Sequence, residues 1–541
     1  MAVIARLRQA YPVWPALIAA IACAAPLAAV AALAVSGEWS GYLAHLWSTR
    51  LPVYLINTLQ VTLISGSLAV VLGSGLAWLV ARYEFAGRSV FEWLLALPLA
   101  VPAYAAAYGW FDLTQAAGPL GMLPTVRGAT GAGLVLGLTL YPYVYLLARE
   151  AFAGQSSDAY EAARTLGARP REAFLRAAMP MARPAIAAGL ALVVMETLAD
   201  FGAVAHLGAP TLTVGLIRAW AGEGATADAA RLALILVAIA FLIFALERAQ
   251  RARARQTSAS GRRRPSRRIV LAPLRGLAAA ALCLSPVLLG MVIPLGRLGY
   301  RALNAPVTRD LASAAQNAVL LAVIAGVLAA VLGLAAAYAL RSGTRRGAVA
   351  ARVAGLGYAV PGAVAAMGVL AILGLLQTWI DAAWTGLFGA VFPVMLTGGI
   401  AALIFAYLSR FAAAAIGPAD SALSRVTPAL DGAARTLGAG ARETARRVHW
   451  PLIMQGALLA ALLVFVEVLK ELPATMILRP FNFDTLAVIA HNYASDERLG
   501  EAALPALLIA AVALPPMIWI ARRIVRQEDG RENAVHAEAG R

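Results

Sequence analysis

The chain has 541 residues, of which 61% are hydrophobic and 13% charged, with a mean hydropathy of +0.75. Soluble proteins carry about 25% charged residues, so this composition argues against a soluble protein and indicates one that crosses a bilayer several times. The net charge of +17 does not indicate nucleic-acid binding, because the arginines stand at the ends of apolar stretches rather than on a polar domain.

Twelve apolar stretches are long enough, at about 20 residues, to span a bilayer as helices. The first six are expected near residues 14–36, 53–82, 89–112, 131–150, 183–205 and 229–246. The other six are expected near residues 269–296, 313–340, 348–376, 385–410, 452–478 and 501–521. Residues 1–246 and 269–522 therefore form two sets, joined by a basic cytoplasmic linker at 247–268 and followed by a polar cytoplasmic tail at 523–541.

The two sets repeat in the same direction. Asn57, Gly66 and Gly73 match Asn317, Gly326 and Gly333, and Arg149 is matched with Arg410. The offset between matched residues of the two sets increases by about ten residues, and we place this insertion between the fourth span and the loop of the second set. Six spans per repeat give both sets one orientation in the membrane, and the positions of the arginines predict that both termini are cytoplasmic.

A short segment recurs in the two sets and carries the strongest functional signal. EAARTLGA at 161–168 returns as GAARTLGA at 432–439, and a proline follows each glycine at the same spacing. Each copy predicts a short helix with a small-residue face that ends at a left-handed glycine, which makes a compact knob able to enter a groove on a partner. The residues of this prediction are Glu161, Ala162, Ala163, Gly167, Asp431, Ala433, Ala434 and Gly438.

These loops resemble the cytoplasmic EAA loops of the inner-membrane permeases of ATP-binding cassette (ABC) importers. The resemblance implies an all-α integral membrane protein of about 12 transmembrane helices, built as two parallel six-helix permease repeats like a type I ABC importer. It also implies that the loops dock on two copies of a cytoplasmic ABC ATPase, with Glu161 available to an arginine of that partner. The second loop departs from the family pattern, because Gly432 stands in place of the glutamate and Asp431 points about 100° away.

The chain itself carries no ATP-binding motif. Its one lysine, Lys470, lies between Leu469 and Glu471 and cannot belong to a phosphate-binding loop. We therefore expect a transport subunit that is not an enzyme and binds no cofactor, with ATP bound by the partner ATPase. The outside loops are too short for a substrate-binding domain, which implies a separate periplasmic binding protein and a location in the bacterial inner membrane.

Ionisable residues inside spans are costly, which makes them functional candidates. Glu196 and Asp200 are four residues apart in the first set, as are Glu467 and Glu471 in the second, so each pair is expected to share one helix face. With Lys470 these residues predict a translocation pathway or gate whose net negative charge favours a cation, with no fixed metal site. Structural pairing within the fold is the alternative.

Two segments narrow the resemblance further. Residues 195–208 and 470–488 resemble the matching segments of permeases for periplasmic ferric iron. Permeases for thiamine share the fused architecture, and phosphonate and polyamine systems are further alternatives. A secondary transporter driven by an ion gradient is a more remote one, since it would not need the paired loops.

Overall fold

The computed structural model describes residues 13–37, 41–153, 157–257, 268–307 and 310–539. Within these ranges, eleven helices are long and apolar enough to cross a membrane. A further span arises if the bent pair Arg88–Ala100 and Ala103–Thr114, whose axes differ by 89°, counts as one crossing. The predicted all-helical fold with about twelve spans is confirmed. The two-residue strands β1 (Tyr83–Glu84) and β2 (Ile269–Val270) add one short parallel pair.

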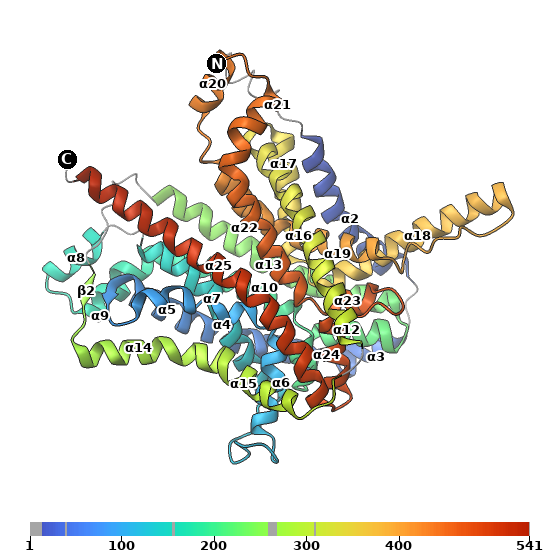
Figure 1. Cartoon of the computed structure of the whole chain (residues 1–541). Coiled ribbons are helices and arrows are strands. Elements are labelled where there is room, and N and C mark those ends of the chain that lie inside the picture. The colour runs from blue at the N-terminus through green and yellow to red at the C-terminus, as the bar shows by residue number, and fades with distance from the viewer. Residues whose placement is uncertain (1–12, 38–40, 154–156, 258–267, 308–309, 540–541) are drawn as a thin grey trace. The chain divides into compact units, whose positions relative to one another are not determined.

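The helices gather into two compact units that do not follow the sequence halves (Figure 1). Unit 1 consists of Met1–Thr49, Gly215–Val237 and Val307–Asn492, and unit 2 of Arg50–Val214, Ala238–Pro306 and Tyr493–Arg541. Each unit therefore holds the central spans of one set together with the outer spans of the other. This grouping concerns packing, and the boundaries of the two sequence repeats stay a prediction.

Unit 2 is centred on three helices that pack pairwise: α4 (Leu51–Arg82), α7 (Gly128–Ala153) and α10 (Met179–Ala199). The first span of the second set, bent into α14 (Pro273–Val287) and α15 (Ile293–Leu303), packs in this unit, as does α25 (Leu499–Ala539). Other elements of the unit are α5 (Arg88–Leu94), the 3-10 turn Leu97–Ala100, α6 (Ala103–Thr114) and α11 (Gly202–His206).

Unit 1 has an equivalent centre of three helices that pack pairwise: α16 (Leu311–Arg341), α19 (Ile400–Leu423) and α22 (Trp450–Leu469). The first span of the chain, α2 (Trp14–Ser36), packs against α16, α19, α17 (Arg345–Ala354) and α18 (Gly362–Phe388). Other elements are α3 (Gly41–Thr49), α23 (Pro473–Leu478) and α24 (Leu486–Ser495). The helices α12 (Leu212–Ile217) and α13 (Thr226–Thr257) continue from one unit into the other.

Matched glycines bring matched helices into contact, which supports the repeat and corrects its register. A β-carbon at Gly73 would lie 2.6 Å from Val144 Cβ, and one at Gly333 would lie 2.7 Å from the Ala415 carbonyl oxygen. The contacted residues Val144 and Ala415 are 271 positions apart, as the two EAA loops are. The register therefore shifts before the fourth span, where α18 has 27 residues and α6 has 12, so the match of Arg149 with Arg410 is wrong.

Two predicted spans of the second set are misplaced. The stretch expected at 348–376 divides into α17 and α18, and the stretch expected at 385–410 is α19, which begins at Ile400. Residues 348–416 are apolar almost throughout, so hydropathy alone does not separate them. The actual boundaries are backbone features, namely Pro361 before α18 and the left-handed Gly389 (φ +71°) after it.

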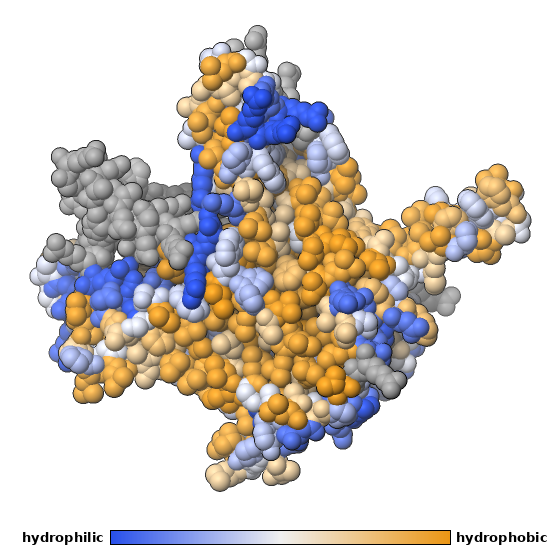
Figure 2. Space-filling model, in the orientation of Figure 1, coloured by the Kyte–Doolittle hydropathy of each residue, from blue (hydrophilic) through white to orange (hydrophobic). Residues whose placement is uncertain are grey.

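The predicted linker and tail are partly helical. Helix α13 continues through residues 247–257, and α25 continues to Ala539. Residues 258–267 of the predicted linker lie outside the described residues. Large apolar side chains are exposed along the spans, including Leu59 and Leu63 on α4 and Val327 and Val331 on α16, and much of the visible surface is apolar (Figure 2). Such a surface suits contact with lipid.

The close packing at Gly73 predicts a strong contrast between two glycines of one helix. Gly73→Ala places a methyl group 2.6 Å from Val144 Cβ and is expected to cost about 1–3 kcal/mol of stability through overpacking. Gly75→Ala meets no atom within 4 Å and is expected to be neutral or stabilising, because alanine favours a helix. Thermal unfolding of both purified variants tests this, and an equal effect of the two would contradict the packing.

Candidate functional site: two matched loops

The first loop is a helical hairpin whose first helix ends at the predicted glycine. Helix α8 (Ser157–Thr165) is followed by Gly167 at φ +88°, and the Ala168 N–H donates to the Ala163 carbonyl at 3.0 Å, which is the Schellman bond of a helix end. The chain then enters α9 (Pro170–Ala173), a π-helical turn (Phe174–Ala178) and α10 without a break. The predicted ending of the first helix at Gly167 is confirmed.

The second loop repeats each of these features. Helix α20 (Pro428–Thr436) is followed by Gly438 at φ +82°, and the Ala439 N–H donates to the Ala434 carbonyl at 3.0 Å. Helix α21 (Ala441–Thr444) and the π-helical turn Ala445–His449 lead directly into α22. Since the helix end, the turn and the rising helix all recur, the sequence repeat is a repeat of structure.

Each loop presents an exposed apolar tip. Leu166 and Leu437, which directly precede the two glycines, are both 87% exposed. Ala162 and Ala433 are exposed on the same short helices, whereas Ala434 is buried against the unit, and Ala163 is half-buried. The two loops therefore expose the same apolar side chain at the same position of the motif.

Glu161 of the first loop is held by its own chain. Its Oε1 atom lies 3.1 Å from Arg82 Nη2 at the end of α4, and its side chain remains 51% exposed. The Arg82 guanidinium also lies 4.8 Å from the centre of the Tyr160 ring. Tyr160 in turn packs on Trp78 of α4, with ring centres 5.2 Å apart. The loop is thereby fixed on the cytoplasmic end predicted for α4.

Asp431 of the second loop is an internal anchor rather than a docking residue. It is 2% exposed, its Oδ2 atom lies 2.7 Å from Arg341 Nη2, and its Oδ1 atom lies 2.7 Å from His449 Nε2. His449 is fully buried, and its Nδ1 atom lies 3.1 Å from the Tyr338 hydroxyl. Burial favours a raised pKa for Asp431, but the hydrogen bonds from Arg341 and His449 outweigh it and lower that pKa.

Two arginines that were not predicted as site residues contact the acids of the loops. Arg82 ends α4 and Arg341 ends α16, so each closes the second span of its set and contacts an acidic residue of its loop. The sequence feature that could have indicated them is an arginine at the end of the second span in both sets. Because Glu161 and Asp431 occupy adjacent rather than identical positions of the motif, the two acids did not look equivalent.

These contacts predict unequal effects of neutralising the two acids. Asp431→Asn is expected to cost the second loop about 2–4 kcal/mol, since it disrupts a buried, charge-assisted network, whereas Glu161→Gln is expected to cost less than about 1 kcal/mol. The lowered pKa means that the stabilisation by Asp431 is complete above its ordinary pKa of about 3.9 and is lost as the pH falls through the folded value. Hydrogen exchange of the two loops, in each variant and across pH, measures both effects; equal loss in the two loops would contradict the assignment.

The acidic pair of unit 2 does not share a helix face. Helix α10 ends at Ala199, and Asp200 has an extended backbone. Its Oδ1 atom accepts the N–H groups of Ala203 and Val204, both at 3.1 Å, so the carboxylate caps the start of α11. Asp200 thus lies at the break between two helices, and Glu196 remains on α10.

The acidic residues of unit 1 are arranged in the same way. Helix α22 ends at Leu469, and Glu471 accepts the N–H groups of Ala474 and Thr475, both at 3.1 Å, at the start of α23. Glu471 also faces Arg410 of α19 at 3.4 Å, and both are buried. Glu467 and Lys470 form an ion pair at 3.0 Å. The expected shared face is therefore wrong here too.

The net negative charge predicted for the pathway is not supported by these contacts. Glu471 and Glu467 each have a cationic neighbour, and Arg410 was missing from the charge count that favoured a cation. Asp200 lies in unit 2 and Glu471 in unit 1, so their convergence on one pathway stays a prediction. Within the described residues, no three His, Cys, Asp or Glu side chains are grouped as metal ligands.

Comparisons with known proteins relate the chain to membrane components of transport systems. Residues 69–258 match the family described as "Binding-protein-dependent transport system inner membrane component". The chain is 24% identical over 485 residues to the "Fe(3+)-transport system permease protein FbpB 2" of Haemophilus influenzae, which covers 88% of this chain and 90% of that protein. It is 32% identical over 189 residues to the "Probable molybdenum ABC transporter permease protein HVO_B0370" of Haloferax volcanii, covering 34% of this chain and 70% of the relative. The "Sulfate transport system permease protein CysT" of Escherichia coli is 28% identical over 189 residues, which cover 33% of this chain and 67% of the relative.

Proposed function

The chain belongs to the family of binding-protein-dependent transport system inner membrane components, and from this premise we propose that it is the permease of a ferric iron importer. As a member of this family it is a multi-pass membrane subunit of a transporter and not an enzyme. In our proposal a periplasmic binding protein delivers the iron, two ABC ATPase subunits dock on the two loops, and both termini are cytoplasmic.

The similarity to the Haemophilus ferric iron permease carries the choice of substrate. That similarity extends over 88% of this chain, and therefore over both sequence repeats, whereas the sulfate and molybdenum permeases correspond to about a third of it. A substrate pathway is formed by many spans, so a relative that matches both repeats is the more informative guide. The charged side chains do not carry the choice, because the acids of unit 1 have basic neighbours.

The geometry of the loops supports docking of an ATPase on each of them. Both end in an exposed leucine beside a left-handed glycine, and both continue through a π-helical turn into a long span. Because the helical backbone is continuous, a displacement of either loop would be transmitted along α10 or α22. These helices end next to the capping acids Asp200 and Glu471, where the chain changes direction. We propose that the loops drive the switch of the pathway through these two hinges.

Uptake of labelled ferric iron tests the proposal. Cells that contain the binding protein and the ATPase are compared with and without this chain, with unlabelled thiamine as competitor. We expect uptake that requires the chain, ignores thiamine and disappears when the ATPase is deleted. Iron uptake that persists without the ATPase would instead indicate a gradient-driven transporter. Absence of iron uptake would refute the substrate, and the permease would then be tested with thiamine, phosphonate and polyamine.

A further inference from the structure

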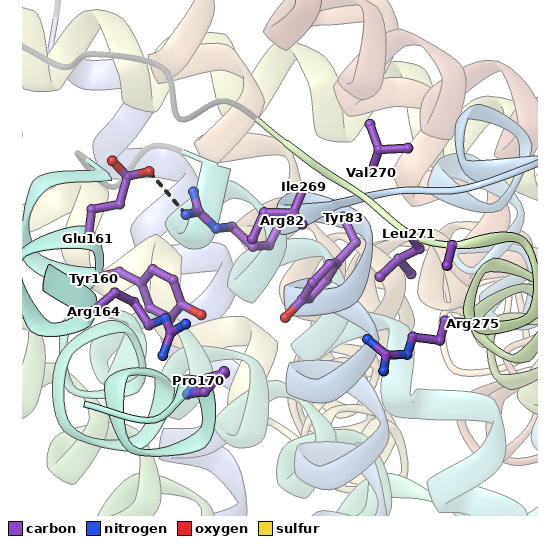
Figure 3. A pocket seen from close by; sticks show the side chains of 11 residues that line it. Arg82, Tyr83, Tyr160, Glu161, Arg164, Pro170, Ile269, Val270, Leu271 and Arg275 are labelled. Carbon is purple, nitrogen blue, oxygen red and sulfur yellow. Dashed lines mark hydrogen bonds and ion pairs between the residues drawn. The ribbon is translucent and has the colours of Figure 1, made fainter. Parts of the chain in front are cut away.

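Unit 2 contains a cavity beside the first loop that transport does not explain. Its volume is about 420 Å³, and its walls come from three parts of the chain: the end of α4 with β1, the first loop, and β2 with the start of α14. Figure 3 shows Tyr83, Arg164 and Arg275 extending toward the same space from these different segments. The parallel pairing of β1 with β2 fixes the wall formed by Ile269 and Val270.

The cavity is basic. Arg82, Arg164 and Arg275 line it against a single carboxylate, that of Glu161, which is paired with Arg82. Arg164 and Arg275 are exposed, and the Arg164 Nη1 atom donates to the Ala168 carbonyl at 2.6 Å, which holds that side chain at the rim. Tyr83 and Tyr160 add two hydroxyl groups. Burial raises the pKa of Tyr160, so its hydroxyl stays protonated and able to donate at neutral pH.

The position of the cavity suits a membrane-surface ligand. Arg82 is the last residue of one candidate span, and Arg275 lies in the first turn of another, so both arginines stand at the ends of candidate spans. Beside the arginines lie Ile269, Leu271 and the 78% exposed Val270. Basic side chains at the ends of spans, next to apolar ones, form the kind of pocket that receives a phospholipid headgroup.

We propose that this cavity binds a phosphate group, either that of an anionic phospholipid headgroup or that of a soluble phosphate. Guanidinium groups offer paired donors that match phosphate oxygens, and the two tyrosine hydroxyls supply further donors. The bound phosphate would connect Arg164 of the first loop with Arg275 at the start of the second repeat. None of the residues that line this cavity belongs to the predicted substrate pathway, so the proposal goes beyond the proposed transport function.

Binding to the purified full-length chain tests the proposal without iron or the ATPase. The delipidated protein is titrated with phosphatidylglycerol and with phosphatidylcholine under native mass spectrometry, and with inorganic phosphate in a calorimeter. We expect saturable binding of phosphatidylglycerol or of inorganic phosphate, and the arm that responds identifies the source. Arg275→Ala is expected to weaken that binding about tenfold, the loss of roughly one charge-assisted contact.

Arg345→Ala is the matched control, since Arg345 is an exposed arginine in the first turn of α17 and lies in unit 1. It removes the same charge and is expected to bind as the wild type does. Tyr83→Phe is a second test that leaves all charges in place, and we expect it to weaken binding two- to fivefold. Equal binding by wild type and Arg275→Ala in both arms, or no binding in either, would overturn the proposal. Thermal unfolding of each variant confirms that the tested protein is folded.

Discussion

Glu471→Ala is expected to destabilise the protein by about 3–5 kcal/mol. The change removes the carboxylate that lies 3.4 Å from the buried Arg410 guanidinium, and with it that ion pair. It also removes the acceptor for the N–H groups of Ala474 and Thr475 at the start of α23. Unfolding of the purified variant in detergent, followed by heat or by denaturant, measures the loss.

Two further variants make this result specific. Glu467→Ala, one turn earlier, is expected to cost clearly less, because the side chains of Glu467 and Lys470 are each 15% exposed, whereas that of Glu471 is 1% exposed. Arg410→Met combined with Glu471→Ala is expected to recover part of the loss, since an apolar side chain replaces a buried charge whose acidic neighbour Glu471 has been removed. A double variant no more stable than Glu471→Ala would show that the pair matters only through the capping of α23.

A charge at the exposed end of each loop is expected to prevent docking of the ATPase without unfolding the chain. Leu166→Asp combined with Leu437→Asp is expected to reduce substrate uptake and recovery of the ATPase with the chain by more than tenfold. Both leucines are 87% exposed, so the change costs little stability but places a charge at the centre of the proposed docking surface. Uptake in cells and co-purification of the ATPase are the two measurements.

Met122→Asp serves as the control, because Met122 is 93% exposed and lies outside the candidate spans and outside both loops. It is expected to retain the ATPase. The single variants separate the loops: equal losses would indicate equal coupling, and a larger loss for Leu166→Asp would fit the first loop's complete EAA motif. Full recovery of the ATPase with the double variant would refute docking on these tips.

The fold was predictable where the sequence contains local signals. Apolar length predicted the spans, and the glycines at 167 and 438 predicted the helix ends, because a left-handed residue is a local requirement of the backbone. The boundaries of α18 and α19 were not predictable from hydropathy, since a residue inside a membrane and a residue at its edge are both apolar over 348–416. The register of the fourth span required the contacts of Gly73 and Gly333, which join residues far apart in the chain.

The charged residues were harder to interpret for a related reason. A spacing of four residues predicts a shared face only if one helix continues through both, and the helices end at Ala199 and Leu469 instead. The partners Arg82, Arg341 and Arg410 lie between 61 and 90 positions from their acids, so nothing in the local sequence connects them. The two loops were found because they repeat, and their anchors were missed because each anchor lies in another helix.

The interleaving of the two units also affects how the protein is made. Helix α2 is synthesised well before its neighbours α16 to α19, the first of which begins at Leu311. At about 5–20 residues per second, α2 waits for roughly 15–60 s before its packing surface exists. Helix α25 shows the reverse order, because it begins at Leu499 and is synthesised long after its neighbours α5 and α6. Neither unit can therefore close during translation of its own sequence half, and a nascent chain interrupted between the repeats would present two incomplete bundles to the quality-control machinery of the membrane.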